Sequence, residues 1–301
     1  MESIRFTAFD TVVEITADTD DASVLEACRA ACTHYERLLS RFDEQGPLWA
    51  LNHACGRHVA LPQELADFIE EALGYCARSE GCFDITMGSV CRLWDFHEGR
   101  VPQTAELAEA LRHVDWRRVH VDGDVAWLDD PCAWIDLGGI AKGYIADRLG
   151  ELLHARGVER AIIDLGGNIL TLGSKEGGRP WRIGIRSPRP SAEGSGSFAV
   201  VEVRGKSVVT SGFYERAFEK DGIVYHHVLD PLAGLPVETD LVSATVVSEH
   251  SIDGDGYSTT LLALGSARAL AFARALPGIE AVLLTRDGAV LKTDGLSLEL
   301  L

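Results

Sequence analysis

Hydrophobic and polar residues recur along this chain with two spacings, and each spacing predicts one kind of element. Apolar residues three and four positions apart form one face of a helix, whereas apolar and polar residues in alternation form a strand. The helical spacing predicts helices at 21–39, 62–79, 104–114, 140–157, 256–264 and 266–276. Alternation and short apolar runs predict strands at 4–17, 119–128, 161–164, 181–185, 198–203, 208–210, 223–229, 241–247, 279–284 and 289–292.

The order of these elements predicts the fold class. Helices and strands mix without a regular βαβ alternation, which favours an α+β fold, with a mixed and largely antiparallel sheet and flanking helices. The segment 4–17 is expected to be one strand, or two strands around Asp10. Two connections are expected, a polar one at 40–52 and a Pro-, Ser- and Gly-rich loop at 188–197. No repeat or long linker interrupts the sequence, so we expect residues 1–301 to form a single domain.

Composition narrows the functional classes. The 301 residues are 46% hydrophobic and 25% charged, with a mean hydropathy of +0.04, which is typical of a globular protein. A net charge of −18 argues against a nucleic-acid partner, because binding its backbone needs concentrated Lys and Arg. No apolar run approaches the length of a membrane span. The first residues lack the charged and apolar regions of a signal peptide, so we expect a cytoplasmic protein.

The cysteines support the same location. The chain has seven, and none forms a CxxC pair, so we expect thiols in a reducing compartment. Cys28 and Cys32 share one face of the first predicted helix, where no histidine or third cysteine joins them. We therefore interpret both as core residues.

A glycine-rich turn in the middle of the chain carries the clearest chemical signal. Asp136, Gly138 and Gly139 follow an apolar stretch and precede a predicted helix that contains Lys142. The free N–H groups of a first helical turn favour an anion, and glycine lets the backbone approach a ligand closely. The acid, the lysine and the bare backbone together suit a nucleotide and a hard cation.

A second set of oxygen atoms is predicted near the C-terminal end. If a helix begins near Gly254, Asp255 and Thr259 lie four residues apart on one face of its first turn. A carboxylate and a hydroxyl, joined by a carbonyl from elsewhere, are hard oxygen ligands that suit Mg²⁺. The alternative, which this segment alone favours, makes Asp255 an N-cap and Thr259 a packing residue.

Other polar residues have simpler interpretations. His227 precedes a turn at Asp230, and a lone histidine is more often structural than catalytic. Asp230 itself is expected to cap that turn. Phe83 is expected to pack in the core, and Asp84 to face solvent or a turn rather than a ligand.

The segment 166–168, Gly-Gly-Asn, follows a predicted strand and fits two interpretations equally, a close approach to a ligand and a β-bulge. It lacks the GxGxxG fingerprint of a Rossmann fold. A Walker A loop, a GxSxG elbow and an HExxH helix are also absent from the sequence. These classes are therefore disfavoured.

In their order along the chain, these segments resemble the ApbE family of flavin transferases, which move FMN from FAD onto a threonine or serine of a protein. The matching segments are 40–52, 81–88, 93–96, 136–147, 166–168, 181–185, 210–212, 227–236 and 255–259. Each segment alone is a weak signal, and the order makes the combination specific. The resemblance implies a fold like that of this family.

The resemblance also implies site residues. By position, Mg²⁺ would be held by the carbonyl of Gly139 and the side chains of Asp255 and Thr259. The residues implied in contacts with FAD are Phe9, Asn52, Cys82, Phe83, Asp84, Asp136, Lys142 and Val228 or its neighbour. The implied catalytic residues are His227, Asp255 and Lys142.

The implied function is Mg²⁺-dependent transfer of FMN from FAD to a Thr or Ser of a target protein, with release of AMP. The expected partners are FAD and that flavin-accepting protein. The chain has Phe9-Asp10-Thr11 where the family commonly has Met-Gly-Thr, and Gly254-Asp255 where Ala-Asp is common. The first change motivates one alternative, a non-catalytic FAD-binding protein. The second alternative is an FAD pyrophosphatase, in which water replaces the acceptor hydroxyl and the products are FMN and AMP.

Overall fold

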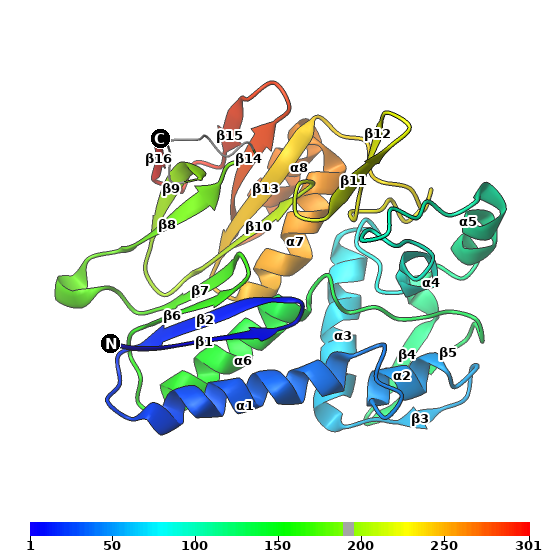
Figure 1. Ribbon diagram of the computed structural model, residues 1–301, viewed down its shortest axis with the longest axis horizontal. Helices are drawn as coiled ribbons and strands as arrows, with labels where there is room; N and C mark the ends of the chain where they lie inside the picture. Colours follow the sequence, from blue (N-terminus) through cyan, green and yellow to red (C-terminus); the bar gives the residue numbers. More distant parts are fainter. Residues whose placement is uncertain (189–195) are drawn as a thin grey trace. The chain divides into compact units, whose positions relative to one another are not determined.

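The computed structural model describes residues 1–188 and 196–301 (Figure 1). These residues form two compact units, each assembled from separate stretches of the chain. The first unit comprises Met1–His34, Ala141–Gly212 and Thr239–Leu301, and the second comprises Tyr35–Ile140 and Phe213–Glu238. The loop expected at 188–197 falls largely on residues 189–195, which lie outside the described residues.

The first unit is built on a large antiparallel sheet. Among the described residues this sheet has eight strands in the order β1-β2-β6-β7-β10-β13-β14-β15. The strands are β1 (Glu2–Ala8), β2 (Thr11–Ala17), β6 (Ala161–Leu165), β7 (Asn168–Leu172), β10 (Ser207–Gly212), β13 (Leu241–Ser248), β14 (Glu280–Thr285) and β15 (Val290–Lys292). In β2, Val13 and Ile15 are buried and Glu14 between them is exposed, as alternation predicts.

Three helices pack against this sheet. They are α6 (Ala141–Ala155), α7 (Ser251–Leu264) and α8 (Ser266–Ala275). Helix α7 packs on β10, β13 and β7, and lies beside α6 (Figure 1). A Cβ atom added at Gly143 of α6 would lie 2.4 Å from the carbonyl oxygen of Ser251, so glycine is required for this close approach. The polar groups at the start of α7 therefore lie within reach of α6.

A smaller sheet and one long helix complete the first unit. The sheet pairs β16 (Leu298–Leu300), β9 (Ser197–Val203) and β8 (Trp181–Arg186), with the short 3₁₀ helix η2 (Glu176–Gly178) preceding β8. Its residues Trp181 and Ile183 pack with Val247 and Val282 of the larger sheet. Helix α1 (Ala22–Leu39) begins in this unit and ends in the second. Its residues Cys28 and Cys32 are fully buried, which confirms their assignment to the core.

The second unit contains shorter elements. Its helices are α2 (Pro47–Asn52), α3 (Gln63–Arg78), α4 (Gly88–Cys91), α5 (Thr104–Leu111) and the 3₁₀ helix η1 (Trp116–Arg118). One sheet pairs β3 (Val59–Ala60), β5 (Val125–Leu128) and β4 (Val119–Asp122), and a hairpin pairs β11 (Ala217–Lys220) with β12 (Ile223–His226). Trp94 packs with Leu107 and Leu229, and its indole N–H donates to the carbonyl oxygen of Gly234 at 3.1 Å. This contact joins the two stretches of chain that form the unit.

The predicted α+β class is confirmed, and all ladders between the named strands are antiparallel. The segment 4–17 forms two strands. The prediction of a plain connection at 40–52 was wrong, because it contains α2. In the described residues, no helix combines the length and the apolar character that crossing a bilayer requires.

Helix α5 begins at Thr104, as predicted, and follows Gln103, whose N–H donates to the Glu106 carboxylate at 2.8 Å. One helix start differs from the prediction. Helix α7 begins at Ser251, earlier than expected, so Asp255 lies in its interior. The interpretation of Asp255 as an N-cap is therefore wrong.

Candidate active site

Asp255 lies on α7 with its carboxylate surrounded by donors of the first unit. The backbone N–H of Gly143 donates to Oδ2 at 2.6 Å, and the side-chain amide of Asn168 donates to Oδ1 at 3.1 Å. The residue is 6% exposed, and burial raises the pKa of its carboxyl, an effect that the positive charge of Lys142 opposes. A buried carboxylate held in one orientation, with its charge poorly solvated, is a group that a bound cation would stabilise.

Thr259 lies one helical turn after Asp255, on the same face of α7. Its hydroxyl lies 3.1 Å from the hydroxyl of Ser211 on β10, which is also 2.8 Å from that of Ser258. The two side-chain oxygens predicted as Mg²⁺ ligands are therefore anchored on one helix. A carboxylate and a hydroxyl fit the preference of Mg²⁺ for hard oxygen ligands.

The third predicted ligand, Gly139, belongs to the second unit, where the site residues form another group. The side chain of Asn52 makes two hydrogen bonds with the backbone of Ile135: the N–H of Ile135 donates to Oδ1 at 2.7 Å, and Nδ2 donates to the carbonyl oxygen at 2.9 Å. A Cβ atom added at Gly139 would lie 3.2 Å from the ring of Phe83. Asn52 and Phe83 thus fix the chain on both sides of Asp136.

Asp136 has partners on both sides of its carboxylate. Oδ1 accepts a hydrogen bond from the N–H of Gly138 at 2.9 Å, and Oδ2 lies 3.4 Å from a guanidinium nitrogen of Arg41. The backbone N–H of Asp136 donates to the carbonyl oxygen of Ile85 at 2.8 Å. The structure therefore brings together Asn52, Phe83, Asp136 and Gly139, four of the residues predicted from the sequence.

Asp84 is buried in a turn. Its carboxylate accepts hydrogen bonds from the N–H and hydroxyl of Thr86, at 2.7 and 2.6 Å, and from the N–H of Trp116 at 3.2 Å. Burial raises the pKa of this carboxyl even so. Of the two environments expected for Asp84, the turn is confirmed and the solvent-facing one is wrong. Phe83 is buried as expected, and Cys82 is partly buried.

His227 follows β12 and keeps a partly exposed imidazole. Its N–H donates to the carbonyl oxygen of Arg216 at 3.1 Å, and its ring Nδ1 lies 3.3 Å from the same oxygen. Its neighbour His226 is buried and stacks on Phe213, with 3.8 Å between ring centroids. Val228 is buried, and its carbonyl oxygen accepts from the N–H of Val237. The two histidines thus have different surroundings.

The turn after His227 is held by Asp230. Its side chain accepts a hydrogen bond from the N–H of Leu232 at 2.8 Å, and its carbonyl oxygen accepts one from the N–H of Gly234 at 2.7 Å. The expectation that Asp230 caps this turn is confirmed. His227 and the turn at Asp230 therefore belong to the same short connection after β12.

Two glycines form the turn between β6 and β7. Gly166 and Gly167 both have positive φ angles, 70° and 97°, in a two-residue hairpin turn that places Asn168 at the start of β7. A Cβ atom added at Gly166 would clash with Thr11, so the β1–β2 turn that carries Phe9 lies beside this one. The bulge interpretation of 166–168 was wrong.

Sequence reasoning missed two residues of this network. Asn168 reaches Asp255, and the Asp147 carboxylate on α6 accepts hydrogen bonds from the N–H groups of Ser251 and Ile252. No local pattern predicts such contacts, because each joins segments that are far apart in the chain. Both residues lie in segments that match the ApbE family, 136–147 and 166–168, and this match could have marked them as candidate site residues.

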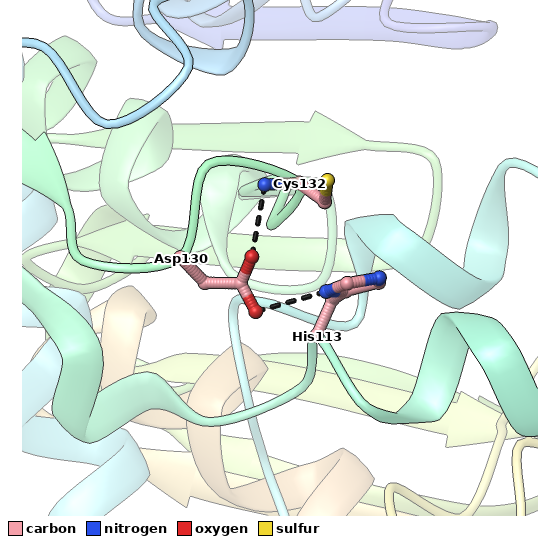
Figure 2. A group of neighbouring side chains, drawn as sticks. All are labelled: His113, Asp130 and Cys132. Atoms are coloured by element: carbon pink, nitrogen blue, oxygen red, sulfur yellow. Dashed lines mark hydrogen bonds and ion pairs between the residues drawn. The ribbon is translucent and has the colours of Figure 1, made fainter.

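Figure 2 shows a separate cluster in the second unit, formed by His113, Asp130 and Cys132. One ligand atom of each lies within 4.8 Å of the others. The Asp130 carboxylate already accepts from Cys132 N–H at 2.9 Å, lies 2.8 Å from His113 Nδ1, and pairs with Arg118 at 3.3 Å. These contacts give the cluster a structural role, because they tie the loop that contains Asp130 and Cys132 to the residues just after α5. It shares no residue with the predicted Mg²⁺ set.

The sequence matches the profile of the ApbE family over residues 9–283. It is 36% identical over 292 residues to the FAD:protein FMN transferase of Treponema pallidum, covering 91% of this chain and 80% of the relative. It is 37% identical over 258 residues to one from Klebsiella pneumoniae, covering 84% and 79%. The crystal structure of the ApbE protein from Thermotoga maritima superposes with a TM-score of 0.89 at 28% identity, covering 97% of each chain. The profile match and the identity to these relatives place this chain in the ApbE family.

Proposed function

We propose that this protein transfers FMN from FAD to a Thr or Ser hydroxyl of a second protein and releases AMP. The observation that carries the proposal is the buried Asp255 carboxylate, held by Gly143 and Asn168 one helical turn from Thr259. Relatives that are 36% and 37% identical to this chain over the aligned residues are named FAD:protein FMN transferases. A protein that only stored FAD would have no evident need of such an oxygen pair.

In this proposal, FAD and its metal are bound by the residues that the family resemblance implies. Asp255, Thr259 and the carbonyl oxygen of Gly139 would hold Mg²⁺, which when bound neutralises charge on the pyrophosphate. Lys142, near the start of α6, would balance the remaining phosphate charge. Phe9, Asn52, Cys82, Phe83, Asp84, Asp136 and Val228 are the proposed nucleotide contacts.

The proposed chemical step is a displacement at the phosphorus that carries the riboflavin group. His227 accepts the proton of the acceptor hydroxyl, and the hydroxyl oxygen forms a bond to this phosphorus. The bond between the phosphorus and the bridging oxygen breaks, and AMP leaves with that oxygen. The product is an FMN phosphoester on the acceptor protein.

A cytoplasmic location is also part of the proposal. All seven cysteines lie in the described part of the chain, and no disulfide joins any two of them. Buried thiols such as Cys28 and Cys76, whose pKa values burial raises to about 11 and about 12, are inert core residues. A reducing compartment is where unpaired cysteines are ordinarily found.

The function is tested with the protein, FAD and Mg²⁺ added to a protein extract of the source organism. Covalent flavin fluorescence on a denaturing gel, followed by mass spectrometry, should identify a Thr or Ser that carries FMN. Asp255→Ala should abolish the labelling. Transfer that is independent of Mg²⁺, or undiminished in Asp255→Ala, would contradict the metal assignment. Rapid release of FMN without an acceptor would instead identify an FAD pyrophosphatase. If FAD were bound but not turned over at all, the protein would be an FAD carrier.

A further inference from the structure

Helix α6 holds α7 at two points that are one helical turn apart. The N–H of Gly143 donates to the Asp255 carboxylate at 2.6 Å. Four residues later, the Asp147 carboxylate accepts from the N–H of Ser251 at 2.7 Å and from the N–H of Ile252 at 2.9 Å. Ser251 and Asp255 are likewise four residues apart, so one face of each helix meets the other. These contacts fix the register between the two helices.

Helix α7 has no cap from its own N-cap residue. His250 has the extended backbone of an N-cap, with φ −100° and ψ 138°, but its side chain makes no capping hydrogen bond. The first N–H groups of a helix have no partner within it, so they must find acceptors elsewhere. Asp147 supplies both acceptors from α6, and the positive charge of Arg148 and of protonated His250 acts on the same carboxylate. The position at which α7 begins is therefore set by a residue of another helix.

A chain of buried side chains connects this helix start to Asp255. The hydroxyl of Ser251 donates to Oδ1 of Asn168 at 2.8 Å, and Nδ2 of Asn168 donates to Asp255 at 3.1 Å. The hydroxyl of Ser207 donates to that of Ser251 at 2.9 Å. Ser251, Asn168 and Ser207 are fully buried, so they have no solvent to replace a lost partner. A shift of Ser251 is transmitted to the orientation of Asp255.

We propose that Asp147 is a positioning residue that orients the Asp255 carboxylate for metal binding, acting through the start of α7 and through Asn168. The inference rests on the proposed function, in which Asp255 is a metal ligand. Asp147 itself contacts Ser251 and Ile252 and does not bind the metal. Partners of this kind, one step removed from a ligand, commonly alter metal affinity by about 10- to 100-fold.

The test is Asp147→Asn, which keeps the size of the side chain but replaces one acceptor oxygen with a donor. The Mg²⁺ concentration for half-maximal FMN transfer should rise about tenfold, whereas KM for FAD at saturating Mg²⁺ should change less than about twofold. Mn²⁺ binding to the FAD-loaded protein, followed by electron paramagnetic resonance, should weaken by the same factor without any need for turnover. If Asp147→Asn does not fold, Asp147→Ser replaces it, and the same changes in Mg²⁺ dependence and Mn²⁺ binding are expected.

Asp240→Asn is the matched control. Asp240 accepts from the N–H of Ser266 at 2.9 Å and so caps α8 from outside, in the same unit. Helix α8 carries none of the predicted ligands, so this variant should lose stability and keep its Mn²⁺ affinity. Adding His250→Asp to Asp147→Asn gives α7 a local cap without a tie to α6. This double variant should regain stability and still bind Mn²⁺ weakly.

Two results would overturn the inference. One is an Mn²⁺ affinity in Asp147→Asn equal to that in Asp240→Asn, and the other is full recovery of that affinity in the double variant. Failure of the proposed function looks different. The wild-type protein would then bind Mn²⁺ and respond to Asp147→Asn as expected, yet transfer no FMN to any acceptor.

Discussion

Phe9 and Asp10 form the two-residue turn between β1 and β2 and have positive φ angles of 55° and 56°. The type I′ form of a two-residue turn has positive φ at both positions, and a left-handed conformation costs a residue with a side chain about 1–2 kcal/mol. Phe9 is also a proposed FAD contact. The backbone strain therefore lies at the proposed site, where such strain is commonly found.

Asp10→Gly should stabilise the protein. Glycine removes the cost of positive φ but adds freedom to the unfolded chain, which leaves a net gain of about 0.5–1 kcal/mol in the free energy of unfolding. Urea unfolding measures it. The control is Asp124→Gly in the two-residue turn between β4 and β5, where the φ angle is not positive. It should lower stability, and a gain there equal to that at Asp10 would rule out the strain argument.

Asp147 also predicts an unusual pH dependence of stability. Burial raises the pKa of its carboxyl from 3.8 to about 6. The N–H groups of Ser251 and Ile252 and the charges of His250 and Arg148 lower this pKa, but burial has the larger effect. Because the folded state binds the proton more tightly, this group's contribution to stability is greatest below pH 4 and falls as the pH rises through 6. The loss is of the order of 3 kcal/mol at most.

Urea unfolding of wild type and Asp147→Asn between pH 4 and 7 measures this contribution. The stability of the wild type relative to the variant should decline over that interval. Asp84, whose pKa burial also raises, belongs to the second unit and affects both proteins alike, so it cancels in the comparison. Parallel pH curves for the two proteins would refute the prediction.

At the scale of elements, periodicity predicted the amphipathic helices well and the start of α7 poorly. Apart from Ile252, the first residues of α7 are small or polar, and Ser251, Gly254 and Asp255 are all buried because α6, β10 and β13 pack around them. A helix buried on all sides has no polar face, so no amphipathic pattern marks its beginning. The spacing of Asp255 and Thr259 placed them on one helix face, but this segment alone favoured an N-cap, and only the family resemblance implied a ligand pair. Their partners on α6 and β7 could not be predicted, because these contacts form only in the folded chain.

Gly143→Ala tests the close approach of α6 and α7. Its Cβ would lie 2.4 Å from the carbonyl oxygen of Ser251, a backbone atom, so the helices would have to separate. We expect a loss of about 1–3 kcal/mol in stability and weaker Mn²⁺ binding. Gly150→Ala is the control on the same helix. Its Cβ would lie 3.1 Å from the flexible end of Leu170, so the change should be near neutral in both urea unfolding and Mn²⁺ titration.

For the whole molecule, the chain passes back and forth between the two units. The first unit contains the N-terminal, a central and the C-terminal stretch, and the second contains the two stretches between them. Neither unit is therefore a continuous piece that one cut could release. That residues 1–301 behave as a single domain stays a prediction, which unfolding experiments can test.

A single unfolding transition is the expected result. Five of the six tryptophans (Trp49, Trp94, Trp116, Trp127 and Trp134) lie in the second unit, and Trp181 lies in the first. Tryptophan fluorescence thus reports mainly on the second unit, whereas far-ultraviolet circular dichroism reports on both. The two urea curves should coincide. If fluorescence changed at a clearly different urea concentration, the units would be separate domains.

The strands of the large sheet occur in space in the order in which the ribosome makes them, from β1 to β15. During synthesis each new strand can therefore add to the edge formed by the one before, and a bare edge faces outward until the final hairpin emerges. Asp255 is translated only after β13 has followed β10. A nascent or truncated chain would thus expose an unpaired strand edge and lack Asp255, the carboxylate proposed to bind the metal. Protection from aggregation and the proposed capacity to use FAD would therefore be acquired at nearly the same moment.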